Sequence, residues 1–205
     1  FCSYCLMPFG RRHVRSRDPE EVAAEAAALV SQGFKEIILT GINTALYGTE
    51  EGFCYPLKPD EEAAGMSGIE IIIKRINDLE GEFRIRLSSL EPTVINAEYV
   101  KRLMKYERLC PHLHLSVQSG SNHVLKLMNR HYDRSQYLEI VKVLRDFDPL
   151  YGITTDIICG FPGEREEDFE DSLDMIRQVK FCKVHAFKYS KREGTAAARM
   201  TEQVP

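Results

Sequence analysis

Helical and strand patterns alternate along the chain. The clearest helix is predicted over RDPEEVAAEAAALVSQGF, where Val22, Ala26 and Val30 share one face. Asp18 is placed to cap this helix, and Gly33 ends it. The short β-branched run KEIILTG follows and is typical of a buried strand. A helix followed at once by a buried strand is the repeating unit of a parallel α/β fold.

The alternation continues to the end of the chain. After the strand at Lys35, strands are predicted over 83–87, 112–117, 153–159 and 183–189, separated by helices over 69–79, 97–106, 122–128, 135–146 and 166–179. Strand–helix–strand units are right-handed and make neighbouring strands parallel. The intervening run TEEGFCYPLKPDEEAAGMSG has no period and many Pro, Gly and acidic residues, so it is predicted to be a loop.

Polar and glycine residues follow four of the predicted strands. They are Gly41 and Asn43, then residues 88–91, 118–121 and 160–164. In parallel α/β proteins the functional residues lie on loops at the carboxyl ends of the strands. The sequence therefore predicts one site at that edge of the sheet.

Composition narrows the class of protein. The 205 residues are 43% hydrophobic and 28% charged, which suits a single globular domain. With 27 basic and 31 acidic residues the net charge is −4, so a nucleic-acid partner would need a local basic patch, and GRRHVRSR is the one basic run. No apolar run approaches the roughly 20 residues that cross a bilayer, so no membrane partner is expected. The scattered single cysteines are typical of a reducing compartment, and we expect the cytoplasm.

The chain opens with FCSYC, two cysteines separated by two residues. A structural zinc site would need a second pair of ligands, and none follows. A redox disulfide would open a helix, whereas Pro8 and Gly10 are expected to break one. An iron–sulfur cluster is therefore favoured for Cys2 and Cys5 over zinc, a redox disulfide or two incidental thiols.

A set of motifs runs through the chain in one order: FCSYC, KEIILTGIN, SSLEP, HLSVQSGSN, TTDIICGFPGE and YSKREGTAAARM. Together they resemble the radical S-adenosylmethionine domain of the methylthiotransferases. The resemblance implies an α/β fold, a partial (β/α)6 TIM-like barrel of parallel strands whose first strand is truncated. It also implies that residues 1–205 are a catalytic core, separated from an N-terminal second-cluster domain and a C-terminal RNA-binding domain.

The same resemblance implies the cofactors. The family holds a [4Fe-4S] cluster with Cys-x-x-x-Cys-x-x-Cys, and Cys2 and Cys5 match its second and third members, which places the third ligand upstream of Phe1. Reductive cleavage of S-adenosylmethionine at this cluster would generate the radical that prepares the substrate for a methylthio group. The sulfur would come from a second [4Fe-4S] cluster in the N-terminal domain, and the electron from a donor such as a flavodoxin or ferredoxin.

The resemblance also implies which residues contact S-adenosylmethionine. Gly41 and Asn43 would contact its amino group, and Gln118 and Ser119 its ribose or carboxylate. Ile158, Gly160 and Phe161 would lie along the adenine. Glu91 and Arg130 would complete the set. No catalytic residue is singled out.

Each of these positions also has a purely structural reading. Gly41 and Asn43 suit an ordinary turn, and Ser121 or Asn122 could cap the next helix. For His112 and His114, packing within a strand is favoured over metal binding.

Within the family, LTGIN, SSLEP and SKREGT are most similar to the branch that acts on threonylcarbamoyl-adenosine beside the tRNA anticodon. Arg11, Arg12, Lys191 and Arg192 could provide cations for the threonyl carboxylate. The alternatives are isopentenyl-adenosine in tRNA, an aspartate of a ribosomal protein, and, in a different class, a non-catalytic metal-binding domain.

Overall fold

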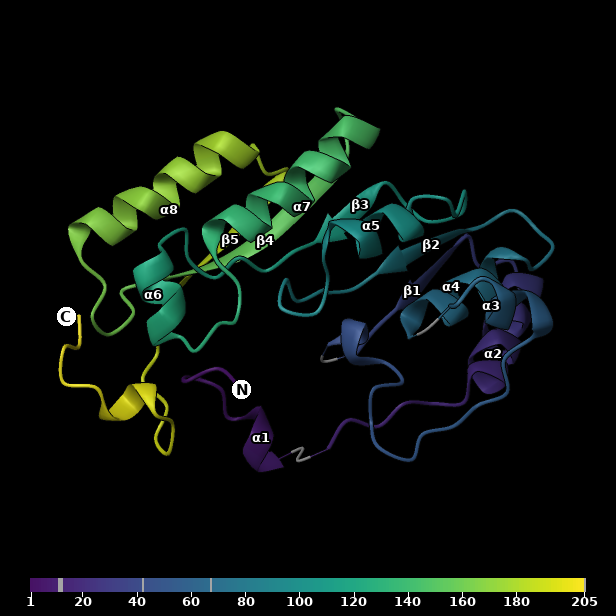
Figure 1. Ribbon diagram of the computed structural model, residues 1–205, viewed down its shortest axis with the longest axis horizontal. Coiled ribbons are helices and arrows are strands. Elements are labelled where there is room, and N and C mark those ends of the chain that lie inside the picture. Colours follow the sequence, from purple (N-terminus) through teal and green to yellow (C-terminus); the bar gives the residue numbers. More distant parts are fainter. Residues whose placement is uncertain (11–12, 42, 67, 205) are drawn as a thin grey trace.

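The computed structural model describes residues 1–10, 13–41, 43–66 and 68–204. Its parallel strands form two sheets: β1 (Glu36–Leu39) pairs with β2 (Arg84–Leu87), and β4 (Gly152–Cys159) lies between β3 (His112–His114) and β5 (Lys183–Lys188). Isolated parallel bridges, Ile85 to Leu109 and Leu90 to Leu115, connect the two sheets. The described strands thus form one open parallel layer, as expected for a partial barrel (Figure 1).

Helices connect successive strands where the sequence predicts them. Asp18 caps the first long helix by accepting hydrogen bonds from the backbone N–H groups of Glu20 and Glu21. The helices are α2 (Pro19–Ser31), α4 (Ile69–Asn77), α5 (Ala97–Leu103), α6 (Asn122–Leu127), α7 (Arg134–Phe147) and α8 (Glu166–Val179). The α/β alternation is confirmed, and no described helix has the length and hydrophobicity needed to cross a membrane.

Three local predictions are wrong. The run predicted as a loop contains α3 (Pro59–Ala63), because the buried Glu61 pairs with Arg75 of α4. A single helical turn, α1 (Met7–Gly10), forms although it contains Pro8. A proline near the start of a helix costs little, because the N–H that it lacks would have no hydrogen-bond partner there. The third strand pairs regularly only to His114, because beyond it the Thr155 hydroxyl, in place of the β4 backbone, bonds the Leu115 carbonyl and the Val117 N–H.

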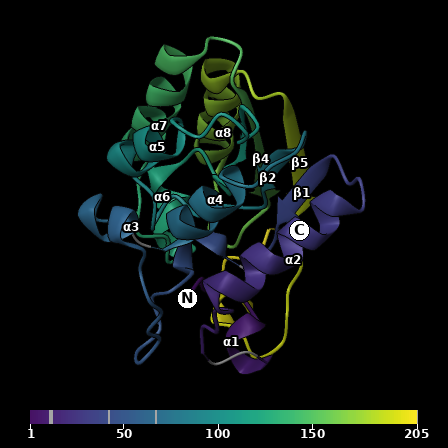
Figure 2. The same ribbon diagram turned by 90° about the vertical axis from the view of Figure 1, so that its right-hand side faces the viewer.

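One face of the strands packs against the helices. Ile85, Leu113 and Ile153 are fully buried in a core that includes Ile73 of α4 and Tyr137 of α7. Figure 2 shows these helices grouped to one side of the strands. Two short 3-10 turns, η1 (Thr44–Leu46) and η2 (Ala197–Arg199), lie outside this layer.

The opposite face, which we call the inner face, is polar. Arg86 of β2 pairs with Glu36 of β1, Nε to Oε1, at 2.9 Å. The Nδ1 of His114 lies 2.9 Å from Oγ1 of Thr154, and its Nε2 lies 3.1 Å from Oδ2 of Asp156. His114 therefore belongs to a hydrogen-bonded network between strands, in agreement with the packing interpretation.

Candidate functional site

The carboxyl ends of the parallel strands place three predicted segments on one edge of the sheet. Gly41 follows β1, Gln118 follows β3 and Gly160 follows β4. The cysteine loop is attached to the same edge, because the backbone N–H of Ser3 donates to the carbonyl of Met128 at 3.0 Å. Figure 1 shows the N-terminus, α6 and the C-terminal turn together at this end of the strands.

A chain of hydrogen bonds joins residues from four separate segments of this edge. The Nδ2 of Asn43 donates to Oε2 of Glu91 at 2.8 Å. Glu91 accepts a second bond on Oε1 from Nη1 of Arg130 at 2.5 Å, and Nη2 of Arg130 donates to the Tyr4 hydroxyl at 2.8 Å. Three predicted site residues are therefore in contact, and Tyr4 is an addition that its position between the two cysteines could have indicated.

Aromatic rings form the wall next to the cysteine loop. Phe161 is fully buried, with its ring centroid 5.8 Å from that of Tyr4 and 5.2 Å from that of Tyr189. Ile158 packs against the same small cluster. Burial raises the pKa of the Tyr4 phenol to about 12, so it remains protonated and the loop gains no negative charge from it.

The backbone at Gly160 turns with a left-handed φ of 73°, a conformation that costs glycine little. Its N–H donates to the Glu164 carboxylate, which also accepts from the N–H of Phe161 at 3.2 Å. Burial raises the pKa of Glu164, and these two N–H groups oppose the shift. The Glu164 carboxylate thus fixes the conformation of the turn after β4, so a ligand could bind against a rigid backbone.

The residues after β3 form hydrogen bonds with two different elements, β4 and α8. Gln118 is buried and bonded through its backbone to β4, with its N–H 2.9 Å from the Asp156 carbonyl. Ser119 is fully buried, and its hydroxyl lies 3.4 Å from that of Ser172 on α8. Ser121 caps α6, so the capping alternative is confirmed at that residue, whereas ligand contacts by Gln118 and Ser119 stay predictions.

The two thiols of the cysteine loop are close along the chain and are not in a disulfide. The N–H of Cys5 donates to the carbonyl of Cys2 at 3.1 Å, which closes a tight turn. Burial raises the pKa of the Cys2 thiol, and the positive charge of Arg130 opposes that rise. Among the described residues no group of three or more His, Cys, Asp or Glu side chains could hold a metal ion, so the third ligand that the resemblance implies is not found there.

Three of the five buried side-chain polar atoms that have no hydrogen-bond partner in the described part of the chain lie at this edge; the other two, Tyr99 Oη and His112 Nδ1, lie elsewhere. Among the described residues, Ser88 Oγ after β2, Arg130 Nε and Tyr189 Oη after β5 are buried and make no hydrogen bond. Leaving such groups unpaired is costly, so they suit a ligand that carries both acceptors and donors. The carboxylate, amine and ribose of S-adenosylmethionine provide both, and the residues present fit this cofactor.

Comparison with known families decides the class. The model of the radical SAM superfamily matches residues 1–176. The chain belongs to the radical SAM superfamily. Enzymes of this superfamily use S-adenosylmethionine and a [4Fe-4S] cluster.

Curated relatives match the whole of this radical SAM chain. A tRNA-2-methylthio-N(6)-dimethylallyladenosine synthase from Clostridium botulinum is 41% identical over 205 residues, and one from Caldicellulosiruptor saccharolyticus is 44% identical over 207. A threonylcarbamoyladenosine tRNA methylthiotransferase from Thermotoga maritima is 42% identical over 205 residues. The chain spans 43%, 41% and 44% of these relatives, less than half of each.

Solved structures support the fold of this radical SAM chain. Coproporphyrinogen III oxidase from Escherichia coli superposes with a TM-score of 0.64 at 14% identity, covering 100% of this chain and 45% of that one. A radical S-adenosylmethionine methyltransferase from Kitasatospora setae gives 0.66 at 14% identity, covering 91% and 34%. The partial-barrel prediction is confirmed.

Two of the four cations proposed for a substrate carboxylate belong to the described residues, and both fall outside this bonded site. Arg11 and Arg12 lie outside the described residues, and Lys191 and Arg192 are exposed.

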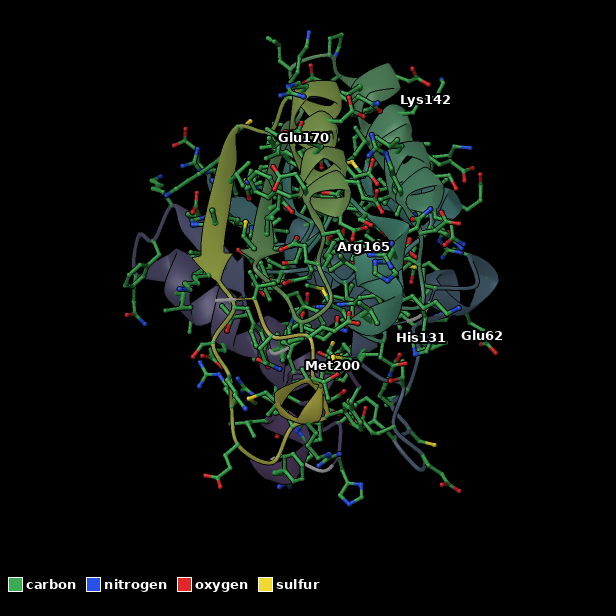
Figure 3. All side chains as sticks on the ribbon, turned by 90° about the vertical axis from the view of Figure 1, so that its left-hand side faces the viewer. Glu62, His131, Lys142, Arg165, Glu170 and Met200 are labelled. Carbon is green, nitrogen blue, oxygen red and sulfur yellow. The ribbon has the colours of Figure 1, made fainter. Side chains whose placement is uncertain are left out.

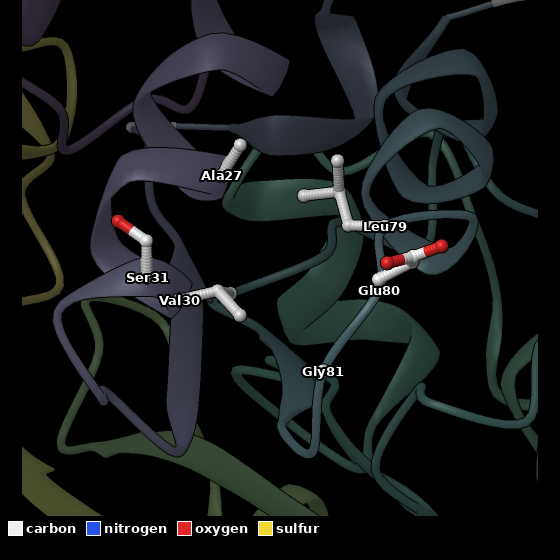
Figure 4. Close-up of a pocket in the computed structure, with 6 residues that line it drawn as sticks. All are labelled: Ala27, Val30, Ser31, Leu79, Glu80 and Gly81. Carbon is white, nitrogen blue, oxygen red and sulfur yellow. The ribbon is translucent and has the colours of Figure 1, made fainter.

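A hollow of about 510 Å³ is lined by residues at the carboxyl ends of α2 and α4, among them Val30 and Leu79 (Figure 4). Those helix ends lead into the amino ends of β1 and β2, so this hollow lies at the opposite edge of the sheet from the site.

Proposed function

We propose that the chain is the catalytic core of a radical S-adenosylmethionine methylthiotransferase that modifies an adenosine beside the anticodon of tRNA. The observation that carries the proposal is the cysteine loop fixed beside Arg130 and Tyr189, whose buried Nε and Oη make no hydrogen bond within the described residues. The names of relatives more than 40% identical over the whole chain support it. The full-length protein would add a second-cluster domain, an RNA-binding domain and an external electron donor.

The described residues have separate tasks in this proposal. Cys2 and Cys5 would ligate the cluster. Arg130 is held in place because Nη1 and Nη2 bond to Glu91 and Tyr4, and its Nε would donate to the cofactor carboxylate. Asn43 is oriented by Glu91, and Gly160 supplies the turn along which the adenine would lie. The cluster and S-adenosylmethionine supply the radical when bound. The fully buried Phe161, packed against the half-buried Tyr4, excludes water from one wall.

For the substrate we propose threonylcarbamoyl-adenosine. The inner face behind the site presents hydrogen-bonding groups, among them His114, Thr154 and Asp156. These groups bond one another and make the inner face polar, which favours a polar threonyl substituent over an aliphatic tail. The dimethylallyl base is the second candidate, because the C. botulinum and C. saccharolyticus relatives carry it in their names.

Nucleoside analysis tests the proposal. Transfer RNA from a strain lacking the gene is digested and its nucleosides are weighed by mass spectrometry. We expect loss of the methylthio form of threonylcarbamoyl-adenosine, restored by the wild-type gene and by Cys182→Ser, a change at an exposed cysteine, but not by Cys2→Ser. Loss of the dimethylallyl counterpart alone would transfer the assignment to the second candidate. Unchanged tRNA nucleosides would overturn the proposed function, and so would unchanged tRNA together with loss of the modification from a ribosomal protein.

A further inference from the structure

Residues 188–199, which we call the cationic segment, begin at the last residue of β5 and carry four cations and a single carboxylate, Glu193. The four cations are exposed, and within the described part of the chain none of them makes an ion pair or a side-chain hydrogen bond; they are Lys188, Lys191, Arg192 and Arg199. The chain as a whole has a net charge of −4, so this segment departs from its surroundings.

Cations on helices α5 and α7 behave differently. Lys101 of α5 lies 2.6 Å from Glu98, and Lys142 of α7 lies 2.5 Å from Asp146. Arg102 pairs with Glu70 at 2.6 Å. Neighbouring carboxylates therefore offset much of the positive charge on the helical face, whereas the charge on the cationic segment is available to a partner.

The cationic segment is held in a fixed place beside the site. Tyr189 N–H donates to the Cys159 carbonyl at 2.8 Å, and the buried Thr195 donates its hydroxyl to the Arg192 carbonyl at 2.7 Å. The N–H of Ala197 donates to the carbonyl of Ser3, inside the cysteine loop, at 2.9 Å. Figure 3 shows β5 running along one side of the molecule toward the turn that carries Met200. The cationic segment is thus anchored to the cysteine loop through Ala197.

An exposed aromatic ring accompanies these charges. Phe187, directly before Lys188, leaves 52% of its surface exposed; other phenylalanines are exposed too, and Phe187 is the one that adjoins the cationic segment. Proteins that bind single-stranded nucleic acid combine cations along the backbone with aromatic side chains on which bases stack. Phe187 and the cationic segment provide both elements within a few residues.

We propose that the cationic segment together with Phe187 is the docking surface for the phosphate backbone of a single-stranded stretch of RNA whose target base enters the site. The partner follows from charge complementarity: unpaired cations on an otherwise acidic chain match a polyanion, and the exposed ring matches its bases. This inference rests on the proposed function, since it names the surface by which the RNA substrate of that site is held.

Salt-dependent RNA binding tests the inference without cofactor or catalysis. A fluorescently labelled RNA stem-loop is titrated with the protein at several salt concentrations. Each phosphate contact on a single strand contributes about 0.7 to the slope of log K against log salt. The double variant Lys191→Ala, Arg192→Ala should therefore lower that slope by about 1.4. The matched control, Lys101→Ala with Lys142→Ala, removes two exposed, paired cations and should leave the slope unchanged.

Phe187→Ala separates stacking from charge. It should weaken binding roughly fivefold or more while the salt slope stays the same. A slope for the Lys191 and Arg192 variant equal to that of the control would overturn the inference. Binding to phosphatidylserine vesicles that depends on the same cations, without binding to the stem-loop, would overturn it too. If the slope falls as expected but tRNA is never methylthiolated, the proposed function fails and the docking surface stands.

Discussion

Replacing Arg75 by Met should destabilise the fold far more than an ordinary surface change. The Arg75 guanidinium bonds both oxygens of Glu61 at 2.7 Å, and also contacts Glu20 at 2.8 Å and the carbonyl of Pro56 at 2.9 Å. Only 2% of the Arg75 side chain is exposed and none of that of Glu61. Removing one partner of a buried pair costs about 3–5 kcal/mol, because the remaining charge stays buried without compensation.

Urea unfolding measures this cost. With a slope near 2 kcal/mol per molar urea, the midpoint of Arg75→Met should fall by roughly 1.5–2.5 M. The matched control is Arg17→Met, which breaks an exposed pair with Glu25 and should cost about 0–1 kcal/mol. Replacing both Arg75 and Glu61 by Met should recover much of the loss, because no charge is then left buried. An Arg75→Met midpoint inside the range of the control would refute the reasoning.

The same pair provides a test by pH. Hydrogen bonding from Arg75 holds the pKa of Glu61 below its ordinary value. A carboxylate with a lowered folded-state pKa stabilises the fold above its unfolded pKa of about 4.3, and this contribution is lost as the pH falls toward the folded value. In Arg75→Met the unpaired, buried Glu61 has a raised pKa, so the difference in unfolding free energy between wild type and variant should be largest at neutral pH and shrink on acidification. A difference that grows on acidification would contradict this account.

Two further substitutions test the packing that supports the site. Gly120→Ala should cost about 1–3 kcal/mol, because its new Cβ would lie 2.5 Å from the backbone oxygen of Asp171 in α8. Gly10→Ala, with nothing within 4 Å of its Cβ, is the control, and equal urea midpoints for the two variants would contradict the packing argument. Ser121→Ala should cost about 1–2 kcal/mol, since Ser121 caps α6 and bonds the buried Asp168; an unchanged unfolding midpoint would show that the cap contributes nothing.

The strands and long helices could be predicted because their causes are local. β-Branched runs, caps and apolar periodicity are read within a few residues, as at Asp18. The α3 turn could not be predicted in this way, because it depends on an ion pair between Glu61 and Arg75, 14 residues apart. A pattern read over a short window does not contain that contact.

The candidate site, like the fold, could be predicted only where its causes are local in the sequence. The motifs indicated Asn43, Glu91 and Arg130 one at a time, but not their contacts, which cross 48 and 39 residues of chain. Tyr4 joins the network across 126 residues. The direction of the Ser119 side chain was equally hidden, because it depends on the left-handed backbone of the preceding Gln118. Sequence thus predicts which residues reach the strand ends, whereas packing decides how they meet.

Anaerobic reconstitution of the full-length protein with iron and sulfide tests the central claim most directly. The measurement is the yield of 5′-deoxyadenosine and methionine after S-adenosylmethionine and a reductant are added, together with visible iron–sulfur absorption. Wild type, Cys54→Ser and Cys182→Ser should form the cluster and cleave the cofactor, since both control cysteines are exposed and lie outside the cysteine loop. Cys2→Ser and Cys5→Ser should do neither. A colourless protein that binds zinc and leaves S-adenosylmethionine intact would contradict the account.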